Sequence, residues 1–167
     1  MRRLTPEIAT MIQTQIVNES NNVRLYRSMS EFLKFNGWTG AAKLWKKYSD
    51  QEQGHADKLC QYLQDRNWQP LTQSLAAYPK EFGSLESVIN QSYLHEIEVT
   101  NQINTISESA FNEPDQPTFT FMQWFVNEQI EEEAKMLEWV SRIQAYKDSN
   151  SDLILLDKEM KHAAKKL

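Results

Sequence analysis

The sequence is poor in cysteine and in the residues that interrupt regular structure. Gly and Pro together make up about 5% of the 167 residues, against a usual level of roughly 12%. This scarcity argues against a turn-rich β-sandwich or barrel. The single cysteine, Cys60, excludes an internal disulfide and any multi-cysteine zinc or iron–sulfur site. No apolar run approaches 18 residues, and the first four residues lead into Thr5-Pro6-Glu7. We therefore expect no membrane span, no signal peptide and a cytoplasmic location.

Positive charge is also in short supply. The chain has 18 Lys and Arg against 23 Asp and Glu, a formal net charge of −5. This balance argues against nucleic acid or an anionic membrane as a partner. What the chain does contain is 40% apolar residues, including seven Phe, six Tyr and five Trp. It can therefore bury a substantial core, and an all-α protein is the fold class that fits best.

Capping residues divide the chain into five expected helices within one domain, residues 1–167. Thr5 before Pro6-Glu7 is typical of a helix N-terminus, and Thr39, Ser84 and Ser151 are the other predicted caps. The helices are expected at about 5–35, 39–66, 84–111, 118–146 and 151–165.

The lengths of the connections predict the topology. The first and third connections are short, so each joins two antiparallel helices. Residues 67–83 contain Pro70, Pro79 and Gly83 without sustained periodicity, and 17 extended residues span up to about 56 Å. A helix of 28 residues is only about 42 Å long, so this connection can cross the whole bundle. One long crossover between helices two and three, with a short fifth helix, predicts a ferritin-like four-helix bundle.

Each long helix carries a glutamate in the middle of its apolar stripe. These four residues lie 12 to 14 positions after the predicted N-caps, about 18–21 Å along each helix: Glu19, Glu52, Glu96 and Glu132. Antiparallel helices meet side by side at mid-height, so we expect the four carboxylates to converge. Tyr26 is expected in the core beside them. His95 and His162 are expected to be ordinary surface residues.

Four buried carboxylates require positive charge, and no Lys or Arg occupies the central stripe positions. Two divalent cations would neutralise them. Glu52 and His55 are spaced to share one helix face, and oxygen ligands with one imidazole suit iron, manganese or zinc. Gln129 lies one turn from Glu132, where it could act either as a ligand or as a hydrogen-bond donor to one.

Several segments resemble the bacterial non-haem ferritins over nearly the whole chain. The segments that carry the likeness are residues 16–19, 52–57 and 95–96, and above all 117–133, PTFTFMQWFVNEQIEEE. The resemblance implies a first iron site at Glu19, Glu52 and His55. It implies a second at Glu52, Glu96 and Glu132, with Glu52 bridging, Gln129 nearby and Tyr26 beside the centre.

The resemblance also bears on a third iron and on haem. Relatives hold a third iron with an acid before the bridging glutamate and two acids of the fourth helix. Glu128 and Glu131 are present, but Gln51 replaces the first acid, so we expect this site to be weak. Haem-binding relatives carry Met where this chain has Gln53, and a second Glu-x-x-His where it has Lys135. We therefore expect no haem.

The function implied is iron storage with ferroxidase activity. Fe²⁺ would be oxidised by O₂ or H₂O₂ at the di-iron centre, and ferric mineral would be stored in a homo-oligomeric shell of 24 subunits. By the same resemblance, Glu113 and Asp115 match a region that lines iron-access channels. Two alternatives remain open from the residues alone: a stand-alone di-metal oxidase or peroxidase, and a structural assembly stabilised by metal.

Overall fold

The computed structural model of the protein describes residues 4–167, so the first three residues of the expected domain and N-terminal segment lie outside it. Five helices and no strand occur in that part of the chain. Their bounds are α1 Pro6–Phe35, α2 Thr39–Asp65, α3 Leu85–Asn112, α4 Gln116–Tyr146 and α5 Asn150–Ala163.

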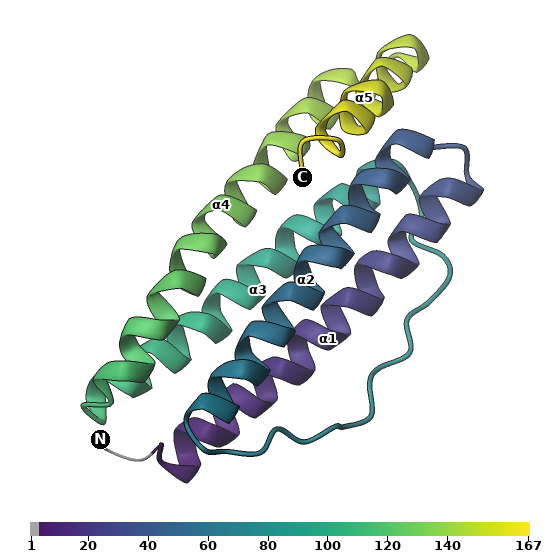
Figure 1. The fold of residues 1–167 in the computed structure, drawn as a ribbon. Helices are drawn as coiled ribbons and strands as arrows, with labels where there is room; N and C mark the ends of the chain where they lie inside the picture. The colour runs from purple at the N-terminus through teal and green to yellow at the C-terminus, as the bar shows by residue number, and fades with distance from the viewer. Residues whose placement is uncertain (1–3) are drawn as a thin grey trace.

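The four long helices form a bundle, with α1 and α2 as one hairpin and α3 and α4 as the other (Figure 1). The crossover between α2 and α3 runs along α1 toward its C-terminal end. Hydrogen bonds follow this path: the Gln13 amide pairs with both backbone groups of Leu71, the Ala76 N–H donates to Asn21 Oδ1, and the Ser28 hydroxyl donates to the Pro79 carbonyl. Because the crossover returns the chain to the opposite end of the bundle, α3 runs parallel to α2. The predicted all-α bundle with one long crossover and a short fifth helix is confirmed.

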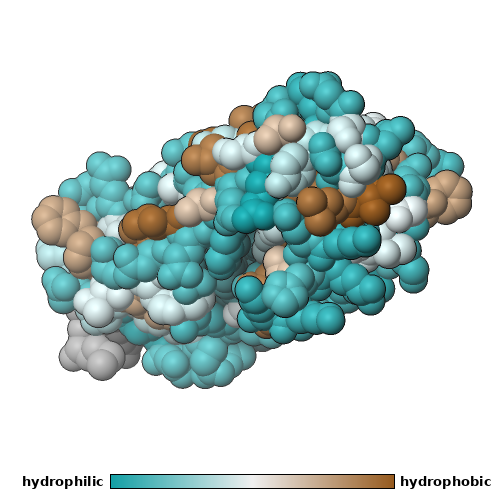
Figure 2. All heavy atoms as spheres, turned by 90° about the horizontal axis from the view of Figure 1, so that it is seen from above, coloured by the Kyte–Doolittle hydropathy of each residue, from teal (hydrophilic) through white to brown (hydrophobic). Residues whose placement is uncertain are grey.

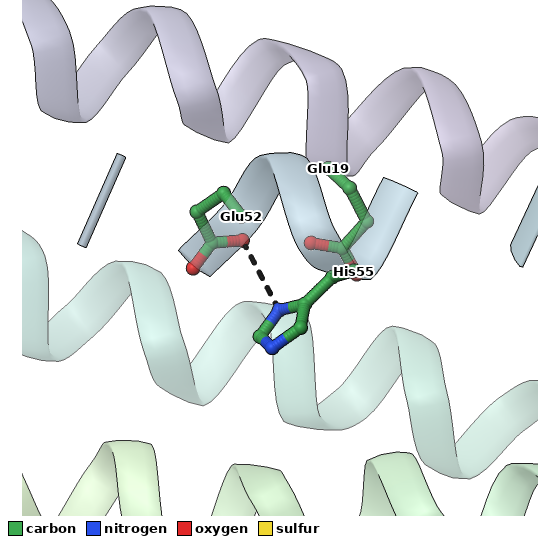
Figure 3. A group of neighbouring side chains, drawn as sticks. All are labelled: Glu19, Glu52 and His55. Carbon is green, nitrogen blue, oxygen red and sulfur yellow. Dashed lines mark ion pairs between the residues drawn. The ribbon is translucent and has the colours of Figure 1, made fainter. Parts of the chain in front are cut away.

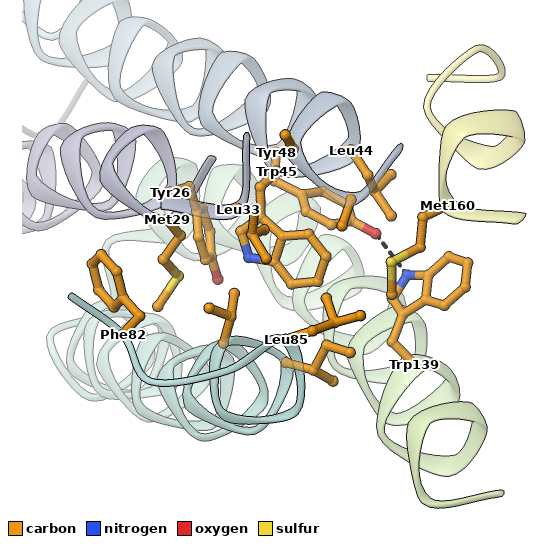
Figure 4. Packing of buried hydrophobic residues seen from close by; sticks show 14 of the residues in the cluster. Tyr26, Met29, Leu33, Leu44, Trp45, Tyr48, Phe82, Leu85, Trp139 and Met160 are labelled. Atoms are coloured by element: carbon orange, nitrogen blue, oxygen red, sulfur yellow. Dashed lines mark hydrogen bonds between the residues drawn. The ribbon is translucent and has the colours of Figure 1, made fainter. Parts of the chain in front are cut away.

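The core consists of two apolar clusters at opposite ends of the bundle. One lies toward α5 and is rich in aromatic residues, including Tyr26, Trp45, Tyr48 and Trp139 (Figure 4). Its polar aromatic atoms are paired: the indole nitrogen of Trp139 donates to the Tyr48 hydroxyl at 3.0 Å. The other cluster lies near the start of α1 and includes Ile8, Ile12 and Ile103 among its residues. Burial of these clusters holds the helices in register, so the polar residues between them lie at a fixed height.

Two helix N-termini are capped as the sequence predicts. The Thr5 hydroxyl accepts from the Ile8 backbone N–H, and the Ser84 hydroxyl accepts from that of Ser87. Three other boundaries differ from expectation. Ser149 rather than Ser151 caps α5, and α4 begins at Gln116 with Asp115 as its cap. The prediction that Thr39 caps α2 is wrong, because Thr39 is the first residue of the helix and Trp38 occupies the cap position.

The N-terminus of α2 is capped by α5 instead. Both carboxylate oxygens of Asp157 accept backbone N–H groups, from Gly40 at 3.0 Å and from Ala41 at 2.8 Å. A carboxylate at this position also interacts favourably with the positive end of the helix dipole. The short C-terminal helix is therefore attached to the bundle by a charged, bidentate contact.

The face drawn in Figure 2 is mostly hydrophilic, with apolar side chains in separate small groups. No helix of the described residues is long and apolar enough to cross a membrane. Residues of the apolar stripes, such as Ile8, Trp45, Ile89 and Phe125, are buried in the bundle.

α5 approaches α2 closely at Gly40. A Cβ added at Gly40 would lie 1.8 Å from the carbonyl oxygen of Asp157, which is backbone and cannot rotate away. We expect Gly40→Ala to displace α5 and to lower the free energy of unfolding by about 2 kcal/mol or more. Thermal or urea unfolding measures the effect.

Gly54, in the same helix, is the matched control. A Cβ at Gly54 would meet no atom within 4 Å. Since Ala is favoured over Gly in a helix by about 1 kcal/mol, Gly54→Ala should stabilise the protein. Equal effects of the two substitutions would contradict the tight α2–α5 contact.

Candidate metal centre

Four glutamates, one from each long helix, lie between the two apolar clusters. Glu19, Glu52, Glu96 and Glu132 are 1%, 4%, 1% and 3% exposed, respectively. The four acids lie close enough for the Glu96 and Glu132 charges to act on Glu52. Among the described residues, however, only Glu19, Glu52 and His55 place ligand atoms within reach of a single metal ion. The apolar clusters above and below hold the four helices in register. The polar positions between the clusters therefore lie at the same height.

Glu19, Glu52 and His55 form the tightest group (Figure 3). Each offers a ligand atom, and these atoms all lie within 4.8 Å of one another. Glu52 and His55 are three residues apart on α2, with the His55 Nδ1 atom 3.6 Å from Glu52 Oε2. Glu19 faces them from α1. Two carboxylates and an imidazole at this spacing could hold one divalent cation of the iron, manganese or zinc type.

Glu96 and Glu132 form the other side of the centre. The Tyr26 hydroxyl donates to Glu96 Oε1, and the Gln129 amide donates to Glu96 Oε2 at 3.2 Å. Tyr26 is thus a core residue bonded to the centre. Gln129 serves here as a hydrogen-bond donor to a candidate ligand, one of the two roles expected for it.

Two amide side chains, Gln15 and Asn22, form hydrogen bonds with Glu19 and Glu52. Neither residue was singled out from the sequence. Gln15 donates to Glu19 Oε1 at 2.8 Å. Asn22 donates to Glu19 Oε2 at 3.1 Å and to Glu52 Oε2 at 3.2 Å, so a single amide joins the two carboxylates. These donors hold the carboxylate oxygens without adding a charge that would repel a cation.

His95 is not an ordinary surface residue, contrary to the prediction. Its Nε2 atom lies 2.7 Å from Asn22 Oδ1, and its ring packs edge-on against Tyr26. Burial lowers the pKa of His95, which favours the neutral imidazole. The hydrogen bond to Asn22 Oδ1 leaves the Asn22 amide nitrogen facing the two glutamates. In the sequence, the one indication that His95 lies near the centre is that it directly precedes Glu96.

No Lys or Arg occupies the central stripe positions, but one lysine reaches the centre from outside the stripes. Lys135 Nζ lies 3.3 Å from Glu132 Oε1 and 3.9 Å from the exposed Glu131. Lys135 is off the apolar stripe but one turn from Glu132, so its long side chain reaches inward. One positive charge against four buried carboxylates still leaves the layer strongly acidic.

Burial and mutual repulsion raise the pKa values of three of these acids, Glu19, Glu52 and Glu96. Burial, with the Glu96 charge next, raises the pKa of Glu52 to about 8. Burial raises the pKa of Glu96 to about 7, and burial and the Glu52 charge raise that of Glu19 well above its ordinary value. Acids with such pKa values release protons readily when a cation binds, as expected of metal ligands.

The residues expected around a third metal ion are less closely grouped. Glu131 is exposed and Glu128 half-buried, and no metal-like group of acids and histidines includes them among the described residues. Gln51 is half-buried, and its Oε1 atom is buried without a hydrogen-bond partner in the described part of the chain. An amide oxygen is thus available at this position, but no carboxylate.

Asp115, which the family resemblance places near an iron-access channel, is buried within the subunit. It is 2% exposed, and Arg66 Nη1 lies 3.2 Å from its Oδ1 atom. It also caps α4 by accepting from Thr118. Glu113, half-buried, accepts a hydrogen bond from the Thr5 hydroxyl at 2.8 Å. Both acids therefore make structural contacts within the subunit.

The metal-free protein should lose stability as the pH rises from about 5 to about 8. Because Glu19, Glu52 and Glu96 have pKa values in the folded state above the ordinary 4.5, the folded chain binds more protons than the unfolded chain in this range. Their stabilising effect is complete below about pH 4.5 and is lost through pH 7–8. Thermal unfolding in a chelator, at constant ionic strength, should show the midpoint falling by several degrees.

Two controls identify the origin of this slope. Glu52→Gln replaces one acid with a neutral group of the same shape and should flatten the pH dependence. Zn²⁺ should raise the midpoint more at pH 8 than at pH 5, because its ligands must be deprotonated. A metal-free midpoint that stays constant or rises over this range would contradict the assigned pKa shifts.

Comparison with known proteins agrees with this fold. A family model described as a ferritin-like domain matches residues 9–145. The bacterial non-heme ferritin of Campylobacter jejuni is 33% identical over 161 residues, 96% of each chain. That of Escherichia coli O157:H7 is 30% identical over 157 residues, 94% of this chain and 95% of the relative. An open-pore ferritin from the archaeon Archaeoglobus fulgidus has a similar structure, with a TM-score of 0.93 and 28% identity, covering 95% of this chain and 98% of that one. The chain belongs to the ferritin family.

Proposed function

We propose that this protein oxidises Fe²⁺ at the centre between its four long helices and stores the ferric product. The observation that carries the proposal is the set of four buried carboxylates with one imidazole, for which residues 4–167 supply a single lysine as cationic partner. Isolated buried charges of this kind are strongly destabilising, so the arrangement is best explained as a site for divalent cations. Iron is the metal that the family membership indicates.

In this proposal Glu19, Glu52 and His55 bind the first Fe²⁺, and Glu52, Glu96 and Glu132 bind the second. Glu52 is the shared ligand. Each Fe²⁺ gives one electron to O₂ or H₂O₂, and the protein supplies coordination with positions left open for the oxidant. Tyr26 and Gln129 hold the Glu96 carboxylate through hydrogen bonds.

Storage requires more than one subunit, and here the proposal follows the relatives. The chain spans nearly their full length and shares their bundle, so we propose a homo-oligomeric shell of 24 subunits with mineral in its cavity and a cytoplasmic location. We propose that the protein works without haem: Gln53 is exposed and cannot supply a thioether ligand, and Lys135 stands where haem-binding relatives have a histidine.

Assembly size and iron capacity distinguish storage from a stand-alone oxidase or peroxidase. Size-exclusion chromatography with light scattering, followed by iron analysis after aerobic Fe²⁺ loading, provides both. A large particle holding far more than two irons per chain supports storage. A small oligomer that saturates at two irons per chain supports the alternative.

Loss of the bridging ligand should be the most damaging single change. Glu52→Ala removes a ligand from both metal positions, so we expect rapid Fe²⁺ oxidation to fall to the uncatalysed rate. The bundle should still fold, with equal or higher stability, because one desolvated acidic group is gone. Stopped-flow absorbance of ferric product measures the rate, and circular dichroism checks the fold.

Glu98→Ala is the control for this substitution. Glu98 is an exposed carboxylate on α3, two residues from Glu96. Its removal changes the net charge equally but should leave the oxidation rate close to that of the unmodified protein. Normal kinetics in the Glu52→Ala variant would exclude the proposed centre.

The third iron position should be weak because Gln51 offers a neutral oxygen where an acid is expected. We predict two well-occupied iron positions per chain at limiting iron. Gln51→Glu adds a charged ligand near Glu128 and Glu131, and should increase occupancy of the third position and change the ratio of iron oxidised to O₂ consumed. Anomalous diffraction from iron-soaked crystals measures occupancy. Three equally occupied positions in the unmodified protein would show that Glu128 and Glu131 suffice.

A further inference from the structure

The two sides of the centre have hydrogen-bonding partners of different charge. Around Glu19 and Glu52 the donors are the neutral amides of Gln15 and Asn22. No Lys or Arg forms an ion pair with either acid in the described part of the chain. An incoming cation at this side therefore meets two carboxylates, His55 and no competing positive charge.

The other side already holds a positive charge. Lys135 donates to Glu132 Oε1 at 3.3 Å, and this is the one hydrogen bond to the Glu132 carboxylate among residues 4–167. A divalent cation that binds Glu132 would lie within a few ångströms of the Lys135 ammonium and would be repelled by it. Binding at this side therefore requires the ammonium to move.

Lys135 has a place to move to. Its side chain is 32% exposed, so the ammonium lies between the buried Glu132 and the solvent. Glu131, whose side chain is 66% exposed, lies 3.9 Å away on the solvent side. A lysine has a flexible four-carbon stem, so it can exchange Glu132 for Glu131 at small cost.

We propose that Lys135 is a built-in counter-cation that makes the two metal ions bind in a set order. The first occupies the side formed by Glu19, Glu52 and His55, and the second enters at Glu96 and Glu132 only when Lys135 withdraws toward Glu131. This inference rests on the proposed function, since it concerns the same centre. Lys135 acts through Glu132 and is a positioning residue rather than a ligand.

Stepwise binding of Co²⁺ tests the order directly, without any oxidation step. Calorimetry gives the two affinities, and the visible absorption of Co²⁺ reports the coordination of each ion. The unmodified protein should bind two Co²⁺ per chain in two resolved steps. Lys135→Met removes the charge and should tighten the second step by about tenfold, leaving the first within about twofold.

Three further variants separate charge from other effects. Lys135→Gln keeps an N–H donor without the charge and should resemble Lys135→Met. Lys135→Arg keeps the charge and should restore the weak second step. Lys147→Met changes the net charge of the protein by the same amount. Lys147 immediately follows α4 and pairs with Glu86, far from the centre. This variant should bind Co²⁺ as the unmodified protein does.

The outcomes distinguish this inference from the proposed function. If the unmodified protein binds no Co²⁺ at the centre, the proposed function itself fails. If it binds two ions but Lys135→Met leaves the second affinity unchanged, the counter-cation role is excluded and the centre stands. The same exclusion follows if Lys135→Arg tightens the second step as much as Lys135→Met.

Discussion

The burial of four carboxylates in one layer of the bundle is the constraint on which the centre depends. Apolar clusters above and below exclude water from this layer, so each acid must find a partner within the protein or bind a cation. The resulting pKa increases show that the metal-free layer retains protons that it would lose in water. The stability of the fold and the affinity for metal are thus coupled through Glu19, Glu52 and Glu96.

The partners of these acids explain how the site can be formed before metal arrives. Amides from Gln15, Asn22 and Gln129 and the hydroxyl of Tyr26 fix the carboxylate oxygens with neutral donors. Neutral donors orient the ligands without neutralising them, so the attraction for a cation is preserved. A lysine or arginine at each acid would give a more stable metal-free bundle but a poor metal site.

Helical periodicity was sufficient to predict a buried glutamate near the middle of each long helix, because distance along a helix is proportional to residue number. It did not reveal the residues that approach the centre from outside the apolar stripes. His95 reaches Asn22 and Lys135 reaches Glu132 because their side chains are long enough to enter from the flanks. Such contacts depend on how two helices are rotated against each other, which composition and spacing do not specify.

The sequence by itself determined the all-α class, the crossover and the height of the acidic layer, since these depend on local caps, connection lengths and residue periodicity. The tertiary structure decided the features that depend on distant segments. Thr5 and Ser84 cap their own helices through contacts within four residues, whereas α2 is capped by Asp157, more than a hundred residues away. Asp115 likewise belongs to a buried pair with Arg66 rather than to the surface. Local chemistry can be predicted from neighbours in sequence, but the partner of a side chain at a helix end is decided by which segments pack there.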